Sequence, residues 1–321
     1  MKAALRKVYG NPDVIEISEV EIPAIKDNEV LVKVFYTTVN RTDCAILTGK
    51  PFIMQLFLGL GKPRSPFLGT DFAGKVEAVG SKVTNFKVGD SVWGFNDQGI
   101  GSQAAYLSIA EHKEIVHLPP SIDLKQAAAS AEAAHYAYNF INKLKLKSGQ
   151  KVMLNGATGA IGSAMLQFLK YYDLEITVTC KGEHAAKILE YGAKRVIDYT
   201  QEDFTQDPEK YDYVLDAVGK SSFGKCKKLL KEKGIYTSSE LGEWSQNPFL
   251  ALLTAFSRGK KVIFPIPFNP KASFEFISKL SVEGKFKPLM DRTYPLENIA
   301  EAYTYVLKGE KIGNVMIEMP K

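Results

Sequence analysis

The amino-acid sequence predicts an α/β protein with two domains, one rich in β-strands and one built on a doubly wound parallel sheet. The chain has 321 residues, which exceeds the usual size of a single domain. Residues 1–118 contain short runs that alternate polar and apolar residues between turns, which is typical of a compact, barrel-like β domain. After Pro120, short apolar runs alternate with amphipathic helical segments, and this order predicts a doubly wound parallel sheet.

The stretch from Lys151 to Cys180 predicts one strand–helix–strand unit. Apolar runs at its two ends flank a segment whose apolar residues recur at helical spacing. The turn before the helix resembles G-x-G-x-x-G, with Ala157 in place of the first glycine. We expect Gly159 to let the backbone approach a pyrophosphate and Gly162 to let the helix pack closely on the first strand. Free N–H groups at the helix N-terminus would then face the phosphates.

This turn is therefore predicted to bind a dinucleotide. A glycine cluster can also form a tight turn without a ligand, but a strand before it and a helix after it favour the binding interpretation. The residues assigned to the phosphates are Gly156, Ala157, Thr158, Gly159, Ala160, Ile161 and Gly162.

The remaining elements follow from the same periodicities. In the first region we expect strands at 1–8, 14–20, 29–36, 74–80, 91–94, 106–109 and 114–118. In the second we expect helices at 124–142, 185–191 and 223–231, and strands at 195–198, 213–218, 234–237 and 261–264. The C-terminal elements are too small to fold alone, so we expect them to complete the first domain: helices at 272–285 and 299–308, and a strand at 314–318. The predicted domains are 1–121 with 266–321, and 122–265.

Composition and charge limit the classes of partner. The net charge of +5 is spread over lysines with interleaved acids and no basic block, so we expect no nucleic-acid partner. The longest apolar run, at 52–60, is too short to span a membrane, and the N-terminus lacks the apolar core of a signal peptide. Three isolated cysteines offer neither a disulfide framework nor paired metal spacing. We expect a soluble, cytoplasmic protein without a membrane span.

Several phrases, taken together, resemble one enzyme family. They are Val39–Asp43, Gly69–Gly74, Val79–Val83, Phe86–Gly94, Ala193–Tyr199, Asp216–Gly219 and Gly313–Ile317. They are similar to the medium-chain dehydrogenase/reductase superfamily, and most of all to its zinc-free quinone oxidoreductase branch, the zeta-crystallin-like NADPH enzymes. The resemblance implies a GroES-like catalytic domain built from both chain ends, with a Rossmann cofactor domain inserted between them.

The resemblance also implies that the chain lacks the zinc sites of related dehydrogenases. The zinc-dependent branch carries a cysteine where Asn40 stands and a histidine–glutamate pair where Thr70 and Asp71 stand. It also has four closely spaced cysteines near residues 94–103, where this chain has none. The four histidines share no ligand spacing, so we expect packing or surface roles for His112, His117, His135 and His184. We predict no metal site.

The sequence favours NADPH over NADH as cofactor. An NAD-specific unit usually ends its second strand with an acid that binds the ribose 2′-OH, but this chain has Lys181, which could pair with a 2′-phosphate. The resemblance adds Tyr199, at the position of a family tyrosine that contacts the same phosphate. Lys181 could instead be a solvated surface lysine, and we expect Glu183 to cap the following helix. The predicted cofactor site is completed by Ala217, Val218, Gly219 and Asn314.

Hydride transfer mainly requires that the substrate be positioned against the nicotinamide with water excluded. The resemblance places Asn40 and Asp43 beside the cofactor and substrate cleft, although they could equally cap a local turn. It also places Tyr136, at the position of a family threonine, near the nicotinamide. His135 or Tyr136 could therefore donate a proton, or both could be packing residues on an amphipathic helix.

These residues predict an NADPH-dependent, zinc-independent reductase of quinones or α,β-unsaturated carbonyls, with small apolar substrates. The alternatives are a zinc-free dehydrogenase acting on an alcohol–carbonyl pair and a protein that binds NADPH without turnover. The insertion at 48–60 is expected to form a wall or lid over the cleft, or else a packing or dimer contact. The sixth strand of the second domain would be an exposed apolar edge, so we expect a homodimer joined through it, as in the resembling family.

Overall fold

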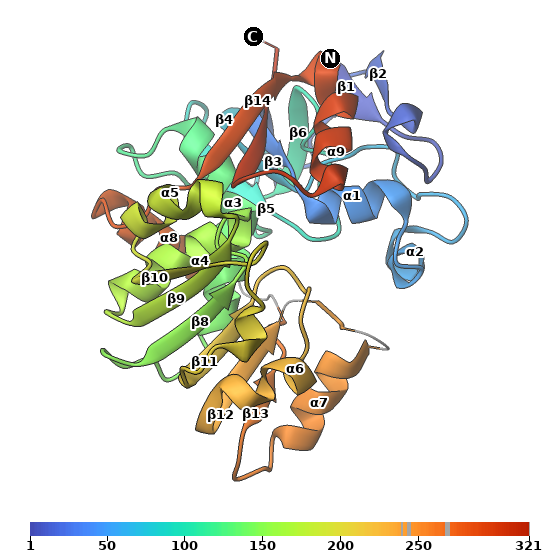
Figure 1. The fold of residues 1–321 in the computed structure, drawn as a ribbon. Helices are drawn as coiled ribbons and strands as arrows, with labels where there is room; N and C mark the ends of the chain where they lie inside the picture. The colour runs from blue at the N-terminus through green and yellow to red at the C-terminus, as the bar shows by residue number, and fades with distance from the viewer. Residues whose placement is uncertain (239, 243–244, 267–269, 321) are drawn as a thin grey trace. The chain divides into compact units, whose positions relative to one another are not determined.

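The computed structural model describes residues 1–238, 240–242, 245–266 and 270–320. The chain forms two compact units, and both of its ends belong to the first (Figure 1). Unit 1 consists of Met1–Glu132, Pro270–Gly284 and Pro288–Lys321; unit 2 consists of Ala133–Asn269 and Lys285–Lys287. The predicted α/β class is confirmed by the sheets of the two units. The functional domain limits given above stay a prediction.

Unit 1 is built mainly from antiparallel strands. Its strands are β1 Lys2–Leu5, β2 Glu16–Glu19, β3 Glu29–Val39, β4 Asp71–Val79, β5 Ser91–Phe95, β6 Tyr106–Ala110, β7 Ile115–His117, β14 Met290–Pro295 and β15 Asn314–Glu318. Among the described residues the main sheet has the order β14-β15-β3-β4-β5-β7, and β6 also pairs with β3. Its neighbours are antiparallel except β14 and β15. The predicted strands of this region are confirmed, whereas β14 was not predicted.

The long strand β3 organises the core of unit 1. Its side chains alternate between buried and half-buried along the first half, and the last three positions are all buried. Helices contribute side chains to this core: α1 Arg41–Thr48, α2 Ile53–Leu58 and α9 Ile299–Lys308. The helix α8 Pro270–Val282 packs Phe274 against Trp93 of β5. Phe72 and Tyr303 are fully buried in the core of unit 1. A truncation of Phe72 to alanine would remove about 3–5 kcal/mol of stability, so this core fixes where the strand ends lie.

Unit 2 has a parallel sheet whose strand order reverses in the middle (Figure 1). In the part of the chain that the structure describes, the order is β10-β9-β8-β11-β12-β13, and every pairing is parallel. The strands are β8 Lys151–Asn155, β9 Glu175–Cys180, β10 Arg195–Asp198, β11 Tyr211–Asp216, β12 Leu230–Ser238 and β13 Lys261–Ile263. Ligands of such sheets bind at the carboxyl ends of the strands where the order reverses, here β8 and β11.

Helices connect the strands of unit 2; α7 among them was not predicted from the sequence. They are α4 Ala160–Tyr171, α5 Ala185–Glu190, α6 Phe223–Cys226 and α7 Gln246–Thr254, and α3 Leu124–Ile141 contains the boundary between the units. As predicted, Asp123 caps α3, because its Oδ1 accepts from the Gln126 N–H at 2.9 Å. The C-terminal helix α8 begins at Pro270 and ends at Val282, earlier than predicted.

The helix predicted over 223–231 is wrong beyond Cys226. A 3-10 turn follows, and Leu230 already begins β12, where it pairs with Tyr211 of β11. Leu229 and Leu230 are both buried. Burial of these two side chains and pairing with the central strand override the helical preference of the lysine-rich segment. The strand predicted over 213–218 is β11, and it ends at Asp216, two residues earlier than predicted. The residues after Asp216 form a bend at the carboxyl edge of the sheet.

Candidate active site

The glycine-rich turn of unit 2 lies between β8 and α4, as the sequence predicts. Gly156 has a φ of +90°, a conformation that favours glycine, and a Cβ there would meet Val218 at 2.3 Å. At Gly162 a Cβ would meet the Gly156 carbonyl oxygen at 2.0 Å, so the glycine lets α4 pack against the turn itself. The sequence predicted that Gly162 contacts the first strand, β8. Its observed neighbour is Gly156, the residue directly after β8.

Gly159 is the N-cap of α4 and faces open space. A Cβ there would have only the Gly156 carbonyl oxygen near it, at 3.7 Å, and no side chain among the described residues caps this helix. The N–H groups of the first helical turn have no intrahelical acceptors, and the positive end of the helix dipole lies there too. An anion such as a pyrophosphate is the natural partner of this end of the helix. The residues present therefore fit a dinucleotide.

A buried hydrogen-bond network holds this turn against the loop that follows β11. The Asn155 Nδ2 donates to Asp216 Oδ1 at 3.0 Å, and the Thr179 hydroxyl donates to Asn155 Oδ1 at 2.6 Å. Asp216 in turn accepts from the backbone N–H of Gly219 at 3.0 Å. The predicted cofactor residues Ala217, Val218 and Gly219 are thus brought to the glycine turn, consistent with the 2.3 Å approach of Val218 to a Cβ at Gly156. Sequence reasoning missed Asn155, the last residue of β8, and Thr179, the last but one of β9; the available signal was a polar residue near the end of each apolar strand.

Lys181 and Tyr199 lie side by side at the carboxyl edge. They directly follow β9 and β10, whose last residues Cys180 and Asp198 are paired, and the Tyr199 N–H donates to the Cys180 carbonyl at 3.3 Å. Half of the Tyr199 surface is exposed, and the Lys181 side chain is 45% exposed. Both side chains are therefore available to a phosphate at this edge.

The predicted capping role of Glu183 is wrong. Residues Gly182–His184 form a 3-10 turn, and neither that turn nor α5 has a side-chain cap among the described residues. The Glu183 carboxylate lies 3.5 Å from the His184 ring and 4.0 Å from the Lys181 ammonium. Because both side chains of the Lys181–Glu183 pair are exposed and their charged atoms are 4.0 Å apart, Glu183 competes only weakly with an anion for Lys181.

In unit 1, Asn40 and Asp43 form a capping box at the start of α1. The Asp43 N–H donates to Asn40 Oδ1 at 2.7 Å, and the Asn40 N–H donates to Asp43 Oδ2 at 3.1 Å. The Asn40 amide also donates to the hydroxyls of Thr70 at 3.0 Å and Thr38 at 3.3 Å. Both amide hydrogens are therefore donated within unit 1, and the capping role that the sequence left open is present.

A second buried carboxyl, Asp71, lies in the same polar cluster. It accepts from the Thr38 N–H at 2.7 Å and from the hydroxyls of Thr37 and Thr38. Burial raises the pKa of Asp71 to about 6, even though these donors favour the carboxylate. Burial and the neighbouring charge of Asp71 raise the pKa of Asp43 well above its ordinary value. We call Thr38, Asn40, Asp43, Thr70 and Asp71 the polar centre.

Glu132, at the end of unit 1, was not singled out from the sequence. It is buried, and the Thr42 hydroxyl donates to its Oε1 at 2.5 Å. Burial, followed by the charge of Asp43, raises the pKa of Glu132 well above its ordinary value. Glu132 therefore joins α3 to the first turn of α1. The available signal was an acid among the alanines of an otherwise apolar helix.

His135 and Tyr136 lie on α3 in the part that belongs to unit 2. His135 is buried and burial lowers its pKa to about 4, so the ring is neutral at physiological pH. A neutral ring is a poor general acid, which leaves Tyr136 as the better donor of the two candidates. Tyr136 is half-buried, and its ring meets that of His135 edge-on at a centroid distance of 6.0 Å.

Two further predicted features lie in unit 1. Asn314 begins β15, and its side-chain Nδ2 donates to the Leu289 carbonyl at 2.9 Å. The insertion at 48–60 contains the short helix α2, which exposes Phe52, Leu56 and Phe57. Over the residues that the structure describes, no group of three or more His, Cys, Asp or Glu side chains could hold a metal ion. No helix within the described chain is long and apolar enough to cross a membrane.

Known proteins match the chain along most of its length. A model of the alcohol dehydrogenase GroES-like domain matches residues 26–120, and a model of the zinc-binding dehydrogenase family matches residues 191–317. The chain belongs to the medium-chain dehydrogenase/reductase superfamily. The family predicted from the sequence, with its GroES-like domain and parallel-sheet unit, is confirmed.

Relatives of this superfamily member include oxidoreductases of two kinds. The chloroplastic quinone-oxidoreductase homolog of Spinacia oleracea is 29% identical over 322 residues, which cover 96% of this chain and 95% of that protein. The chloroplastic NADPH-dependent alkenal/one oxidoreductase of Arabidopsis thaliana is 29% identical over 329 residues, covering 99% and 79%. The solved quinone oxidoreductase of Coxiella burnetii has the same fold, with a TM-score of 0.88 at 24% identity over 100% and 99% of the chains.

Proposed function

We propose that this chain is an NADPH-dependent, zinc-independent oxidoreductase that reduces quinones or α,β-unsaturated carbonyls. The observation that carries the proposal is the open N-terminus of α4 at Gly159, at the edge of the sheet where the strand order reverses. When bound, the nicotinamide supplies a hydride from C4. The names of the Spinacia and Arabidopsis relatives support quinones and enones as the acceptors.

The preference for NADPH is supported by the side chains at the ends of β9 and β10. Lys181 offers a cation and Tyr199 a hydroxyl on an exposed edge, and both could bind a 2′-phosphate. Glu183 is the nearest acid in sequence, and its carboxylate lies 3.5 Å from the His184 ring and 4.0 Å from the Lys181 ammonium. The Arabidopsis relative is named NADPH-dependent, which agrees with this choice.

Zinc independence is supported by the chemistry of the polar centre. Asn40, Thr70 and Asp71 offer amide, hydroxyl and carboxylate oxygens, whereas catalytic zinc sites are built from cysteine, histidine and a carboxylate. The Asn40 amide donates to the hydroxyls of Thr70 and Thr38, and the Thr70 hydroxyl donates to Asp43 Oδ1. A quinone or the β-carbon of an enone needs no metal for hydride addition, because hydrogen-bond donors can meet the developing oxyanion.

In this proposal the chain's own residues bind the cofactor, shape the site and donate a proton to the reduced substrate. The turn from Gly156 to Gly162 holds the phosphates, Asn40 and Asp43 fix the start of α1, and Tyr136 donates the proton. Replacing Tyr136 with Phe should lower kcat about tenfold or more, while NADPH affinity stays within about threefold. The matched control is Tyr138→Phe, two residues along α3. Equal activity of both variants and the parent would show that the proton comes from elsewhere.

Variants of Asn40 distinguish a capping role from direct contact with the substrate. A serine keeps the cap acceptor but is too short to reach Thr70, whereas an alanine removes both contacts. If Asn40 only caps α1, Asn40→Ser should keep kcat/KM within about threefold of the parent, and Asn40→Ala should lose about 1 kcal/mol of stability. A loss of kcat in the serine variant without loss of stability would assign Asn40 to the substrate.

One assay separates the proposed function from its alternatives. NADPH oxidation is followed at 340 nm with a p-quinone, a straight-chain enone and the matching saturated ketone. We expect turnover of the first two and none of the third, because the saturated carbonyl lacks an activated β-carbon. Turnover of the saturated ketone would favour the alcohol–carbonyl dehydrogenase, and NADPH binding without oxidation of any acceptor would favour the non-catalytic protein.

We further propose a homodimer joined through β13, and a cytoplasmic location. β13 ends the sheet, and the neighbouring α7 exposes Phe249, Leu252 and Leu253. Replacing Leu252 with Glu should give a monomer in multi-angle light scattering, whereas Leu189→Glu on α5 should leave the mass unchanged. A parent protein that is monomeric at micromolar concentration would contradict the dimer.

A further inference from the structure

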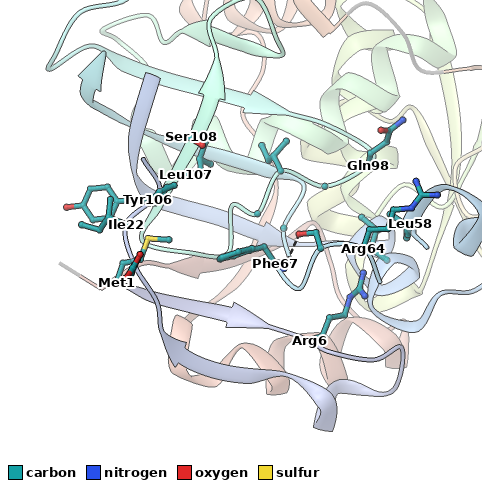
Figure 2. A pocket seen from close by; sticks show the side chains of 18 of the residues that line it. Met1, Arg6, Ile22, Leu58, Arg64, Phe67, Gln98, Tyr106, Leu107 and Ser108 are labelled. Carbon is teal, nitrogen blue, oxygen red and sulfur yellow. Dashed lines mark hydrogen bonds between the residues drawn. The ribbon is translucent and has the colours of Figure 1, made fainter. Parts of the chain in front are cut away.

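Unit 1 contains a cavity of about 660 Å³ that the proposed reaction does not use. It lies between the N-terminal segment, the insertion at 48–60 and the loop at 98–101 (Figure 2). None of the polar-centre residues lines it. Its volume is within the range of sites for small organic ligands.

A buried arginine lines this cavity without a full set of partners. Only 2% of the Arg6 surface is exposed, and its Nε and Nη1 atoms have no hydrogen-bond acceptor in the described chain. The guanidinium lies 4.9 Å from the centroid of the Tyr9 ring, and burial lowers the pKa of Arg6. Figure 2 shows the Arg6 side chain extending toward the segment of Leu58 and Arg64. Buried charges are normally paired, so a guanidinium at a cavity wall with two nitrogens that lack an acceptor in the described chain favours an anionic ligand.

The rest of the lining combines apolar and polar side chains. The apolar part comes from Ile22, Phe57, Leu58 and Phe67. Arg64 adds a second cation and Glu21 adds one acid. Phe57 is 63% exposed, and it continues into the exposed apolar face of α2 that includes Ile53 and Leu56. A ligand could therefore enter with its apolar part along α2 and its charged group toward Arg6.

We propose that this cavity binds an apolar molecule carrying a single carboxylate, held by an ion pair with Arg6. The planar guanidinium matches a carboxylate in shape and charge, and the apolar part of the ligand replaces water against Ile22, Phe57 and Phe67. A neutral apolar ligand would leave Arg6 unpaired, and a small hydrophilic anion would leave the apolar wall wet. The proposal goes beyond the reductase activity and does not depend on it.

Two chain segments contribute both to the cavity and to the polar centre, but they do so through different residues. Ile46 of α1 and Gly69 line the cavity, while α1 also carries Asp43 and Thr70 directly follows Gly69. A carboxylate ligand would thus contact the segments that hold the capping box. The binding test below has a readout that is independent of activity.

The test is calorimetric titration of the whole protein with decanoate, 2-naphthoate and 1-decanol. We expect at least one carboxylate to bind with a Kd of roughly 10 µM, and 1-decanol at least about tenfold more weakly. Binding of decanoate alone would make the ligand aliphatic, and binding of 2-naphthoate alone would make it aromatic; either supports the proposal. The Arg6→Met variant should bind the carboxylate at least about tenfold more weakly and 1-decanol within about threefold of the parent.

Two further variants make the result decisive. Arg258→Met removes an exposed arginine of unit 2 and should leave carboxylate binding unchanged. Ile22→Trp fills the cavity from an exposed position and should weaken the carboxylate and the alcohol alike. Thermal unfolding confirms that each variant is folded. The proposal is overturned if neither carboxylate binds the parent, if Arg6→Met binds it equally well, or if equimolar inorganic phosphate displaces it.

Discussion

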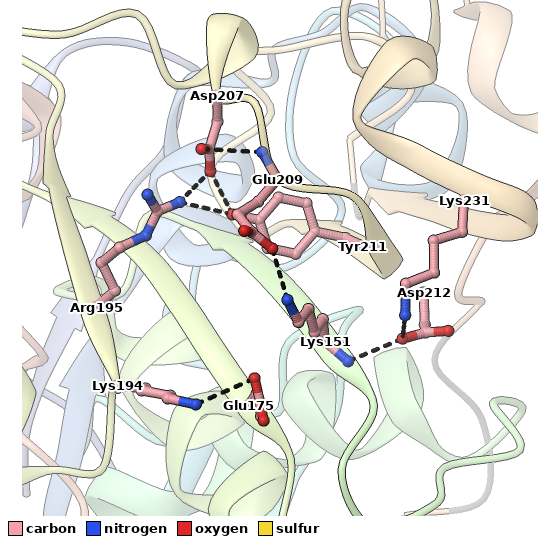
Figure 3. Close-up of polar contacts among 9 residues, drawn as sticks. All are labelled: Lys151, Glu175, Lys194, Arg195, Asp207, Glu209, Tyr211, Asp212 and Lys231. Carbon is pink, nitrogen blue, oxygen red and sulfur yellow. Dashed lines mark hydrogen bonds and ion pairs between the residues drawn. The ribbon is translucent and has the colours of Figure 1, made fainter.

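The two edges of the parallel sheet in unit 2 differ in how their charged and polar groups are paired. At the amino edge, where the strands begin, charged side chains neutralise one another (Figure 3). Lys151, the first residue of β8, pairs with Glu209 at 2.6 Å, and Arg195, the first residue of β10, pairs with Asp207. Lys231 pairs with Asp212 at 2.7 Å. The charges of these three pairs are matched within the chain, whereas Lys228 and Lys260 at the same edge donate to neutral oxygens.

At the carboxyl edge the same sheet leaves its donors open. The N-terminus of α4 has no side-chain cap among the described residues, and Lys181 has only a carboxylate at 4.0 Å. The buried groups at this edge, such as Asp216, are satisfied by loop backbone and so fix the loop shapes. The difference indicates that the charged groups of the amino edge named above are paired within the chain, whereas donors at the carboxyl edge are available to a ligand. The following changes test this contrast, from the largest expected effect to the smallest.

The largest effect is expected at Gly162. A Cβ would approach the Gly156 carbonyl oxygen to 2.0 Å, so Gly162→Val must push the turn away from α4. We expect NADPH affinity to fall roughly 100-fold, because an overlap with backbone costs about 3 kcal/mol. Fluorescence titration with NADPH measures it. The control is Gly224→Ala, where a Cβ would have only the Ser222 Oγ near it, at 3.9 Å. Unchanged affinity in Gly162→Val would remove the turn from the cofactor site.

The next effect compares one lysine from each edge. Lys181→Met removes the cation at the end of β9 and should weaken NADPH about tenfold while NADH changes by less than about twofold. Lys151→Met removes a cation of similar exposure at the start of β8, already paired with Glu209, and should change neither affinity. Titration of both variants with both nucleotides is the measurement. An equal loss for NADPH and NADH would show that Lys181 does not read the 2′-phosphate.

The sequence predicted the elements whose signals are local. The glycine turn, the amphipathic α4 and the apolar strands of the sheet each have a periodicity that does not depend on distant residues. β14 was missed because it contains Asp291 and Arg292 and is mostly half-buried or exposed, so its alternation is weak. α1 was missed as a helix because it has only eight residues, although the Asn40–Asp43 capping box was its signal.

The polar centre could be predicted only in part. Asn40, Thr70 and Asp71 were named as positions that differ from a zinc site, but their mutual hydrogen bonds depend on how β3, β4 and α1 meet. Glu132 joins this region through Thr42, 90 residues away in sequence. Such contacts are set by packing, and no spacing along the chain encodes them. The lack of acceptors for Nε and Nη1 of Arg6 among the described residues is likewise a property of the packed core.

At the amino edge, Arg195→Met should lower stability and leave NADPH affinity unchanged. The Asp207 carboxylate has a side chain only 3% exposed, and Arg195 and Tyr211 both donate to it. Burial raises the pKa of Asp207, but the hydrogen bonds from Tyr211 and Arg195 outweigh burial and hold that pKa below its ordinary value. We expect a loss of about 1 kcal/mol at pH 7 in urea unfolding, since the Arg195 side chain is 43% exposed and solvent screens the pair.

The pH dependence of this loss has a definite sign. Because the folded-state pKa of Asp207 is depressed, its contribution to stability is present above the pKa of the unfolded chain and is lost as the pH falls through the folded value. The difference between Arg195→Met and the parent should therefore shrink below about pH 4. A difference that stays constant down to pH 2 would mean that Arg195 acts through packing of its aliphatic stem.

The smallest effect is expected for Lys194 and Glu175, which pair at 3.1 Å on the same edge. Their side chains are 67% and 41% exposed, so solvent screens the attraction and both chains lose entropy in forming the pair. A double-mutant cycle with Lys194→Met and Glu175→Gln should give a coupling below about 0.5 kcal/mol, which 0.5 M salt reduces further. A coupling above about 1 kcal/mol would show that the amino edge is held together more tightly than its exposure implies. NADPH affinity should stay unchanged in all three variants, since these charges lie at the edge that folding has already completed.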